Sequence, residues 1–475
     1  MRKINAHSLV ILLISLFALA PAWATCGGGG GGGVGGMSGG RGGESNAPVY
    51  TVPWKVRGPK DPAPMGLVLY WLPLSDNELH RSSLRESRTL SLYATQCISM
   101  ELIDYRTPEG QKLIGDSKPP AAVLTKPDGT VIGKAENKNN FLKVEQVEKL
   151  VEGQVKQLES GLDATLKDAK AKAAAGDNTA AIKLYQSVLS EKCMFPKKAK
   201  EAAKELKRLG VEIAAIPDGP VFEKSQSARI EQTMRKGLRA EMNARYVEAE
   251  RLYSLAHRMD PADPTPLRFL GELYRHHIGN WDKARTTFEG ILKMPADPLA
   301  TAIALHGLGK MTIHDGDFRK GLALMEQSVD VFPTALAYRN LAVYWNSEGD
   351  QAKAGEYTQK ALGLDPRDPY NLVFAAVFVA ASGRVDEALR IARENANLLP
   401  ASYNLAAIYA QAGQRDKALS LLQRHFFQYE RYQAVRAKEM MEARVDAVFD
   451  SLRSDASFIA LTRGADGKLP LPMKN

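Results

Sequence analysis

The feature that most constrains the fold of this chain is an internal repetition that begins after residue 225. A small residue recurs at Ala249, Ala284, Gly321, Ala354, Ala388 and Ala418, at intervals of 35, 37, 33, 34 and 30 residues. Glycines keep the same phase at Gly279, Gly316, Gly349, Gly383 and Gly413, and prolines at Pro261, Pro333, Pro366 and Pro400. Three phased markers over about five units indicate stacked supersecondary units.

Each marker has a physical role in a pair of antiparallel helices. A small residue lets two helices approach closely, and large residues such as Tyr253, Phe288 and Met325 fill the adjacent groove. Glycine ends the first helix at little steric cost, and proline cannot continue the second. The pattern resembles the tetratricopeptide repeat (TPR) family, whose repeat is about 34 residues long. The resemblance implies a TPR array over residues 228–422, because a single hairpin cannot bury its apolar face alone.

The first 24 residues predict a secretory signal peptide. Met1-Arg2-Lys3 is basic, Leu9 to Leu19 is almost wholly apolar, and Ala22-Trp23-Ala24 provides a small-residue cleavage site. The apolar run is shorter than the roughly 20 residues that span a bilayer. We therefore expect an exported protein, periplasmic or associated with the cell envelope. The alternative of a lipoprotein uses Cys26 and would add peripheral membrane association through the N-terminus.

Residues 25–47 are dominated by glycine and predict a flexible linker. Residues 48–158 then predict a compact α/β module. Its expected elements are an apolar strand from Gly66 to Trp71, a helix over 75–94, a strand from Ile98 to Asp104 and a hairpin over 119–132. Pro127-Asp128-Gly129 supplies the turn of that hairpin.

This order of elements resembles the thioredoxin fold, in which the hairpin begins at a cis-proline, here Pro120. The Trp-Cys-x-x-Cys motif of that family would fall on Trp71-Leu72-Pro73-Leu74-Ser75, so Leu72 and Ser75 replace both cysteines. Thiol–disulfide exchange needs a low-pKa thiolate and a resolving partner. The resemblance therefore implies a redox-inactive module.

The remaining segments are expected to be helical. Residues 159–215 predict a helical hairpin that resembles a degenerate TPR, and 423–462 predict capping helices. The aromatic residues from Phe426 in that segment could instead form a patch that binds a partner. Residues 463–475 predict a tail. The expected fold class is multidomain, an α/β thioredoxin-like module followed by an all-α TPR superhelix.

The chain has three cysteines, Cys26, Cys97 and Cys193. An exported compartment permits a disulfide, but the wide separation of Cys97 and Cys193 favours two buried free thiols. An alternative function is an oxidoreductase or isomerase that uses one of these two thiols.

Other chemistry has little support in the sequence. Lys and Arg number 63 and Asp and Glu 54, a net charge of +9 that is mild for 475 residues, and we expect no nucleic-acid partner. His276 and His277 are adjacent and are expected in a surface turn, and no histidine pair has the spacing of metal ligands. We therefore predict no catalytic residue, metal or cofactor.

The candidate binding site is the concave face of the array, which the first helices of the hairpins line. The TPR phase places Arg268, Arg275, His306, Lys310, His314, Arg339 and Asn346 on this face. Several basic groups that face one cleft attract carboxylates. We therefore predict a non-catalytic scaffold that binds a protein or peptide partner in the cell envelope, through an acidic segment or a C-terminal carboxylate. The alternatives are a solvated helical face and a structural spacer with no specific ligand.

Overall fold

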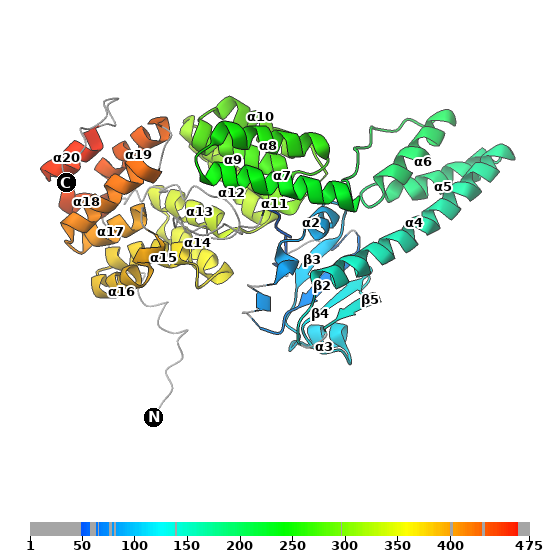
Figure 1. The fold of residues 1–475 in the computed structure, drawn as a ribbon, viewed down its shortest axis with the longest axis horizontal. Coiled ribbons are helices and arrows are strands. Elements are labelled where there is room, and N and C mark those ends of the chain that lie inside the picture. The colour runs from blue at the N-terminus through cyan, green and yellow to red at the C-terminus, as the bar shows by residue number, and fades with distance from the viewer. Residues whose placement is uncertain are drawn as a thin grey trace. The chain divides into compact units, whose positions relative to one another are not determined.

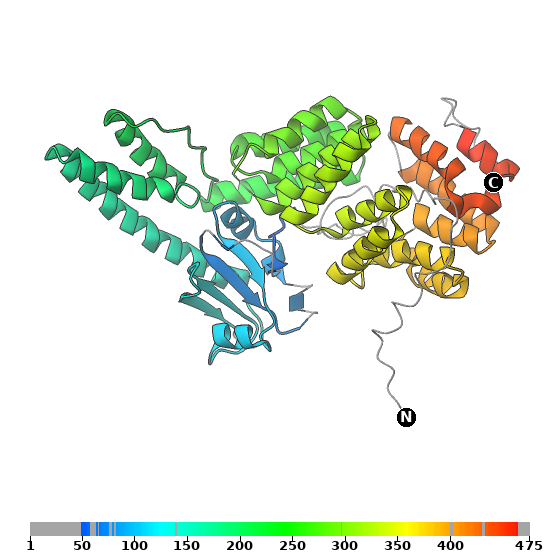
Figure 2. The same cartoon turned by 180° about the vertical axis from the view of Figure 1, so that it is seen from behind.

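The computed structural model describes residues 49–463, except for 58–62, 65, 76–77, 80–81, 138–139, 296, 400–401 and 430–432. The predicted signal peptide, the glycine-rich linker and the tail after residue 463 lie outside the described residues. The chain divides into two compact units, within Gly42–Pro333 and Thr334–Asn475, and Figures 1 and 2 show both from opposite sides. Within the described part of the chain, no helix is both long and apolar enough to cross a bilayer.

The first unit begins with a five-stranded sheet in the order β1-β3-β2-β4-β5. The strand bounds are Lys55–Val56 for β1, Val68–Leu72 for β2, Ser99–Leu102 for β3, Ala121–Thr125 for β4 and Val131–Glu136 for β5. β1, β3 and β2 are parallel, whereas β4 and β5 are each antiparallel to the preceding neighbour in the sheet. β2 is buried at all five positions, because Leu69 and Trp71 enter a core on one face and Val68 and Tyr70 a core on the other.

The helix expected over residues 75–94 is not continuous, so that prediction is wrong. Two serines each start a short helical segment: Ser82 Oγ accepts from the Leu84 N–H and Ser87 Oγ from the Leu90 N–H. The segments are a 3-10 turn, Ser83–Arg85, and helix α2, Arg88–Ala94. α3, Pro108–Ile114, packs on the opposite face of the sheet from α2.

The hairpin predicted over 119–132 is present as β4 and β5, and Gly129 in its turn has a φ of +83°. The peptide bond between Pro119 and Pro120 is cis, as expected. Leu72 ends β2 and is fully buried. Ser75 Oγ accepts a hydrogen bond from the Glu78 N–H. The two positions expected to have lost their cysteines therefore hold a core residue and a local cap.

Helices α4, Val144–Ala174, α5, Asn178–Ser190, and α6, Pro196–Arg208, follow the sheet (Figure 1). Leu166, Tyr185 and Leu206 form their shared core. α4 runs unbroken across residue 158, where the sequence suggests a domain boundary, because no proline interrupts it.

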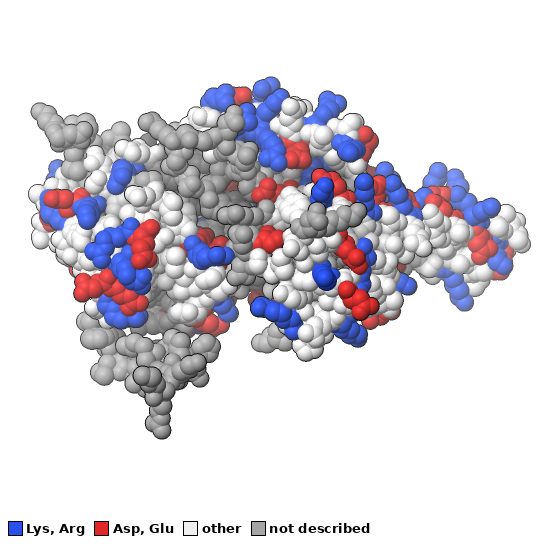
Figure 3. Space-filling view, turned by 60° about the horizontal axis from the view of Figure 1, so that its bottom comes forward, with Lys and Arg blue, Asp and Glu red and all other residues white. Residues whose placement is uncertain are grey.

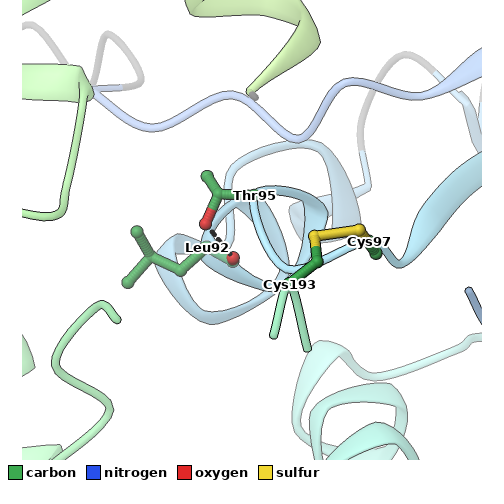
Figure 4. Close-up of a disulfide and its surroundings, with 4 residues drawn as sticks. All are labelled: Leu92, Thr95, Cys97 and Cys193. Carbon is green, nitrogen blue, oxygen red and sulfur yellow. Dashed lines mark hydrogen bonds between the residues drawn. A yellow bond between two sulfur atoms is a disulfide. The ribbon is translucent and has the colours of Figure 1, made fainter. Parts of the chain in front are cut away.

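Cys97 and Cys193 form a disulfide, so the prediction of two free thiols is wrong (Figure 4). Cys97 lies between α2 and β3, and Cys193 lies between α5 and α6. Their Cα atoms are 5.9 Å apart although 96 positions separate them in sequence. The pairing follows from α5 folding back along α4, which separation in sequence does not reveal.

Six helices complete the first unit as three hairpins. They are α7 Lys224–Met242, α8 Tyr246–Met259, α9 Thr265–Leu273, α10 Trp281–Ile291, α11 Pro298–His314 and α12 Phe318–Val331, and a π-helical turn, Tyr274–Ile278, extends α9. Tyr253 and Phe288, two of the large residues named from the sequence, fill the space beside glycines of the first helices, which are not members of the predicted small-residue series. A Cβ at Gly271 would lie 2.3 Å from Phe288, and one at Gly237 would lie 2.5 Å from Tyr253.

The second unit continues the pattern. Its helices are α13 Ala335–Ser347, α14 Gln351–Leu364, α15 Pro369–Ala381, α16 Val385–Asn395, α17 Tyr403–Gln411, α18 Arg415–Arg424, α19 Gln433–Val445 and α20 Ala456–Thr462. Phe426, Phe449 and Phe458 are buried in one core with residues of α17 and α18. Phe426 is therefore a core residue and does not belong to an exposed aromatic patch.

The glycine series marks the turns inside the hairpins, as predicted. All five members have a left-handed φ, from +70° at Gly413 to +100° at Gly316. A side chain at such a position is disfavoured, so glycine is the residue that ends these first helices at the lowest cost.

Candidate functional site

Five of the seven predicted site residues lie in the first unit. Arg268 is in α9, Arg275 is in the π-helical turn, and His306, Lys310 and His314 are in α11. Arg268 and Arg275 are seven residues apart and His306 and Lys310 are four apart, so each pair lies on one side of its helix. We call Arg268, Arg275, His306 and Lys310 the basic cluster. Arg339 and Asn346 lie in α13 of the other unit, so they do not belong to the basic cluster.

The basic cluster is buried, which differs from the open groove that the sequence suggests. The exposed fractions are 7% for Arg268, 6% for Arg275, 4% for His306 and 7% for Lys310. The alternative of a solvated helical face therefore does not fit these four side chains. On the surface, basic and acidic side chains are interspersed over the face in Figure 3. The concentration of basic groups lies inside the array.

One carboxylate is already engaged within this region. Glu272 Oε2 lies 2.7 Å from a terminal guanidinium nitrogen of Arg275 and 3.1 Å from Nε2 of His276. Burial raises the pKa of Glu272, but the positive charge of Arg275 and the hydrogen bond from His276 outweigh burial and lower this pKa overall. Glu272 is thus ionised and neutralises Arg275. His276 is mostly buried in the π-helical turn and is not a surface residue, contrary to expectation.

His306 carries no charge at neutral pH. Burial, followed by the nearby positive charges of Arg275 and Lys310, lowers its pKa to about 3. A neutral imidazole can both donate and accept a hydrogen bond. His306 is therefore polar but uncharged, and it lies near the positive charges of Arg275 and Lys310.

For the other two cations, Arg268 and Lys310, no carboxylate contact is found among the described residues. Within the described residues, neither Arg268 nor Lys310 has a side-chain hydrogen bond or ion pair with a carboxylate. The Arg268 guanidinium lies 5.6 Å from the centroid of the Phe269 ring. Burial lowers the pKa of Arg268, and the charges of Asp297 and Asp263 only partly oppose this. Asp297 caps α11 through the Ala300 N–H, and burial raises its pKa to about 6.

Sequence reasoning missed a second buried charge network in the same unit, centred on Arg88. Arg88 Nη2 lies 2.6 Å from Asp260 Oδ2 and 3.2 Å from Asp263 Oδ2. The Tyr50 hydroxyl donates to Asp263 Oδ2 at 2.8 Å and accepts from Arg88 Nε at 3.1 Å. Arg88 Nη1 donates to the backbone carbonyl oxygen of Val221. The network joins α2, which packs on the sheet, to the turn between α8 and α9.

Only one member of this network, Asp260, belongs to a pattern that can be recognised in the sequence. Asp260 belongs to the Met259-Asp260-Pro261 exit of a repeat, which predicts a helix end but not an ion pair. Nothing near Arg88 distinguishes it from a surface arginine. Its partners are 172 and 175 positions away, so no local pattern could have identified them.

The described residues contain no group of three or more histidine, cysteine or acidic side chains that could hold a metal ion. The disulfide engages Cys97 and Cys193, the two thiols that the oxidoreductase alternative requires. The arrangement with the clearest chemical meaning is therefore the basic cluster.

Comparisons with known proteins bear on the helical part of the chain. A family model described as "Tetratricopeptide repeat" matches residues 315–369, and a second with the same description matches 401–425. The Protein CTR9 homolog of Arabidopsis thaliana is 26% identical over 230 residues, which cover 38% of this chain and 21% of that protein. Photosystem I assembly protein Ycf3 of Rippkaea orientalis (strain PCC 8801 / RF-1) is 28% identical over 121 residues, which cover 22% of this chain and 68% of that protein.

Among solved structures, the crystal structure of the APC/C hetero-tetramer Cut9-Hcn1 matches with a TM-score of 0.34 and 13% identity, over 60% of this chain and 52% of that chain. The match to the CTR9 homolog, by contrast, spans only about a fifth of that protein's length. The two family matches confirm the predicted repeats. The chain is mostly helical, contains tetratricopeptide repeats and carries a small mixed sheet before them.

Proposed function

We propose that this protein is a non-catalytic protein-binding scaffold whose TPR array receives an acidic segment of a partner at the basic cluster. The observation that carries the proposal is the pair of buried cations, Arg268 and Lys310, that lack a carboxylate contact among the described residues. The presence of TPR repeats supports the scaffold role. One relative is, by its name, an assembly protein for photosystem I, a role in keeping with a scaffold.

A buried cation without a partner is costly, because the protein replaces water without returning an opposite charge. Arg275 reduces this cost through its ion pair with Glu272, whereas no such ion pair is found for Arg268 or Lys310 among the described residues. A carboxylate from outside would supply charge-assisted hydrogen bonds to both, and neutral His306 could add a further donor. A carboxylate-bearing peptide therefore fits this site better than a neutral one.

The sheet is proposed to be a thioredoxin-like module without redox activity. The strand order, the cis bond before Pro120 and the hairpin that follows support this assignment. Leu72 and Ser75 stand where the family has its cysteines, and neither can form a thiolate. In this proposal the module anchors the array and takes part in no reaction.

We further propose that the protein works outside the cytoplasm, in the periplasm or cell envelope. The signal-like residues 1–24 and the Cys97–Cys193 disulfide support this location, since disulfides persist in oxidising compartments.

The binding test measures the affinity of the full mature chain for acetylated hexaglutamate, with hexaglutamine as the neutral peptide. Calorimetry should show binding of the acidic peptide only. Arg268→Gln/Lys310→Gln should weaken it at least about tenfold, because each charge-assisted hydrogen bond contributes about 1.5–3 kcal/mol. Without peptide, the variant should unfold at the same or a higher temperature, because two desolvated charges are gone.

The matched control removes two charges from exposed positions of the same array, Arg258→Gln/Lys293→Gln. This control should bind hexaglutamate as the wild type does. Equal affinity of the wild type and the Arg268/Lys310 variant would remove the basis of the proposal and leave the structural spacer. Insulin reduction by the wild type would instead support the oxidoreductase alternative.

A further inference from the structure

Helix α6 has one apolar side and, opposite to it, one basic side. Ala202 and Leu206 belong to the core that α6 shares with α4 and α5. Spacings of three, four and three residues place four lysines together on the other side of the helix: Lys197, Lys200, Lys204 and Lys207. We call these four residues the lysine ridge. At a rise of about 1.5 Å per residue, the ridge is about 15 Å long.

The lysine ridge faces solvent. Lys197, Lys204 and Lys207 are exposed, and Figure 1 shows α4 to α6 extending beyond the edge of the sheet. Among the residues that the structure describes, these three lysines have no ion pair with a carboxylate. Lys200 lies 2.5 Å from Asp218, whose side chain is 89% exposed. An ion pair in such a position contributes little, so it leaves Lys200 available to another anion.

The carboxylates of α6 itself do not neutralise the ridge, because other cations engage them. Glu201 Oε1 accepts a hydrogen bond from Lys170 Nζ of α4 at 2.6 Å. Glu205 Oε1 lies 2.8 Å from a terminal guanidinium nitrogen of Arg208. These are the two acidic residues of α6. The ridge therefore keeps a net positive charge along its length.

The composition of the ridge fits a smooth anionic surface better than a protein partner. Protein interfaces are enriched in aromatic residues and arginine at their centre and depleted in lysine, whereas the ridge consists of lysines alone. The exposed large apolar side chains of the described residues include none from α6. An amphipathic helix that inserts into a bilayer needs a free apolar side, and that of α6 is already packed against α4 and α5.

From this placement we propose that the lysine ridge docks the first unit electrostatically onto the surface of a bilayer that contains anionic phospholipids, without inserting into it. Lysines close to such a surface are attracted by its negative potential and need no pocket. The proposal goes beyond the function proposed for the basic cluster and does not depend on it, because the two sites share no residue.

The experiment measures sedimentation of the full mature chain with vesicles of phosphatidylcholine, either alone or mixed with phosphatidylglycerol. The wild type should bind only the anionic vesicles. Raising the salt concentration from about 0.1 M to about 1 M should release it, because the Debye length falls from about 10 Å to about 3 Å. Lys197→Gln/Lys204→Gln/Lys207→Gln should bind about a hundredfold more weakly, since each lysine near an anionic surface contributes about fivefold.

The matched control removes three exposed lysines from the sheet module, Lys112→Gln/Lys118→Gln/Lys126→Gln, and has the same net charge as the ridge variant. This control should bind the anionic vesicles as the wild type does. Equal binding by the two variants, or no binding by the wild type, would overturn the proposal. Both variants should match the wild type in hexaglutamate affinity. A loss of that affinity in the ridge variant alone would assign the ridge to acidic peptides and would also overturn the proposal.

A second measurement uses the wild type and so does not depend on the folding of a variant. An N-hydroxysuccinimide ester of acetate acetylates exposed lysines, and mass spectrometry quantifies each modified position. Anionic vesicles should slow the acetylation of Lys197, Lys204 and Lys207 relative to the three control lysines. Equal protection of both sets in the bound protein would show that another face contacts the bilayer, which contradicts the proposal.

Discussion

Reduction of the Cys97–Cys193 disulfide should destabilise the first unit by several kcal/mol. The bond closes a loop with a sequence separation of 96, which contains strands β3 to β5 and helices α3 to α5. In the chain-entropy account, a crosslink that closes a loop of about 100 residues stabilises the folded state by about 4.7 kcal/mol at 25 °C. With a urea dependence of about 2 kcal/mol per molar, reduction should lower the unfolding midpoint by about 2 M.

The sheet contains its own fluorescent reporters for this measurement. Trp54 and Trp71 belong to the same core, with ring centroids 5.4 Å apart. Replacing Trp281 and Trp345 by phenylalanine would leave Trp54 and Trp71 as the tryptophans of the described part of the chain. Urea titrations with and without reductant would then give the two midpoints.

The control for this prediction is Cys97→Ser/Cys193→Ser, which should unfold at the midpoint of the reduced wild type and should not respond to reductant. Denatured, unreduced wild type should titrate only the thiol of Cys26 among its three cysteines. Three reactive thiols, or equal midpoints with and without reductant, would refute the reasoning and restore the expectation of free thiols.

Three further changes test the packing and the charges of the first unit. Arg88→Met leaves the Asp260 carboxylate buried without its cation and should cost about 3–5 kcal/mol in urea unfolding. Gly271→Ala would place a Cβ 2.3 Å from Phe288 and should cost about 1–3 kcal/mol, measured in the same way. Burial raises the pKa of Glu241 from 4.5 to about 7, so the folded state keeps this proton longer than the unfolded chain and stability falls as pH rises between these values. Glu241→Gln should remove up to about 3 kcal/mol of that decline, seen by comparing unfolding at pH 5 and pH 8.

The repeats could be predicted because their physics is local. The left-handed φ of the turn glycines and the close approach at small residues depend on neighbours within one hairpin. Such requirements recur wherever the hairpin recurs, so they appear as a period in the sequence. The β4–β5 hairpin and the cis bond before Pro120 were accessible for the same reason, since turn chemistry and proline mark them directly.

The candidate site could be predicted only in its composition. The helical phase correctly placed His306 and Lys310 on one side of a helix, but it could not reveal that they are buried. Burial of a basic side chain depends on which parts of the folded chain surround it, and a helical period does not record those neighbours. The phase also grouped Arg339 with residues that belong to another unit.

The sequence by itself determined that this chain builds helical hairpins of about 34 residues after a small α/β module, because helix ends, crossings and turns are set by residues close together in the chain. Only the tertiary structure decided which cysteines pair, which arginine joins the sheet to the array and which residues from outside the repeats enter the core of the array. These choices depend on contacts between residues 96 to 213 positions apart, such as Cys97 with Cys193 and Tyr50 with Asp263. Such contacts carry no period, since each is made once, and only the folded chain brings their members together.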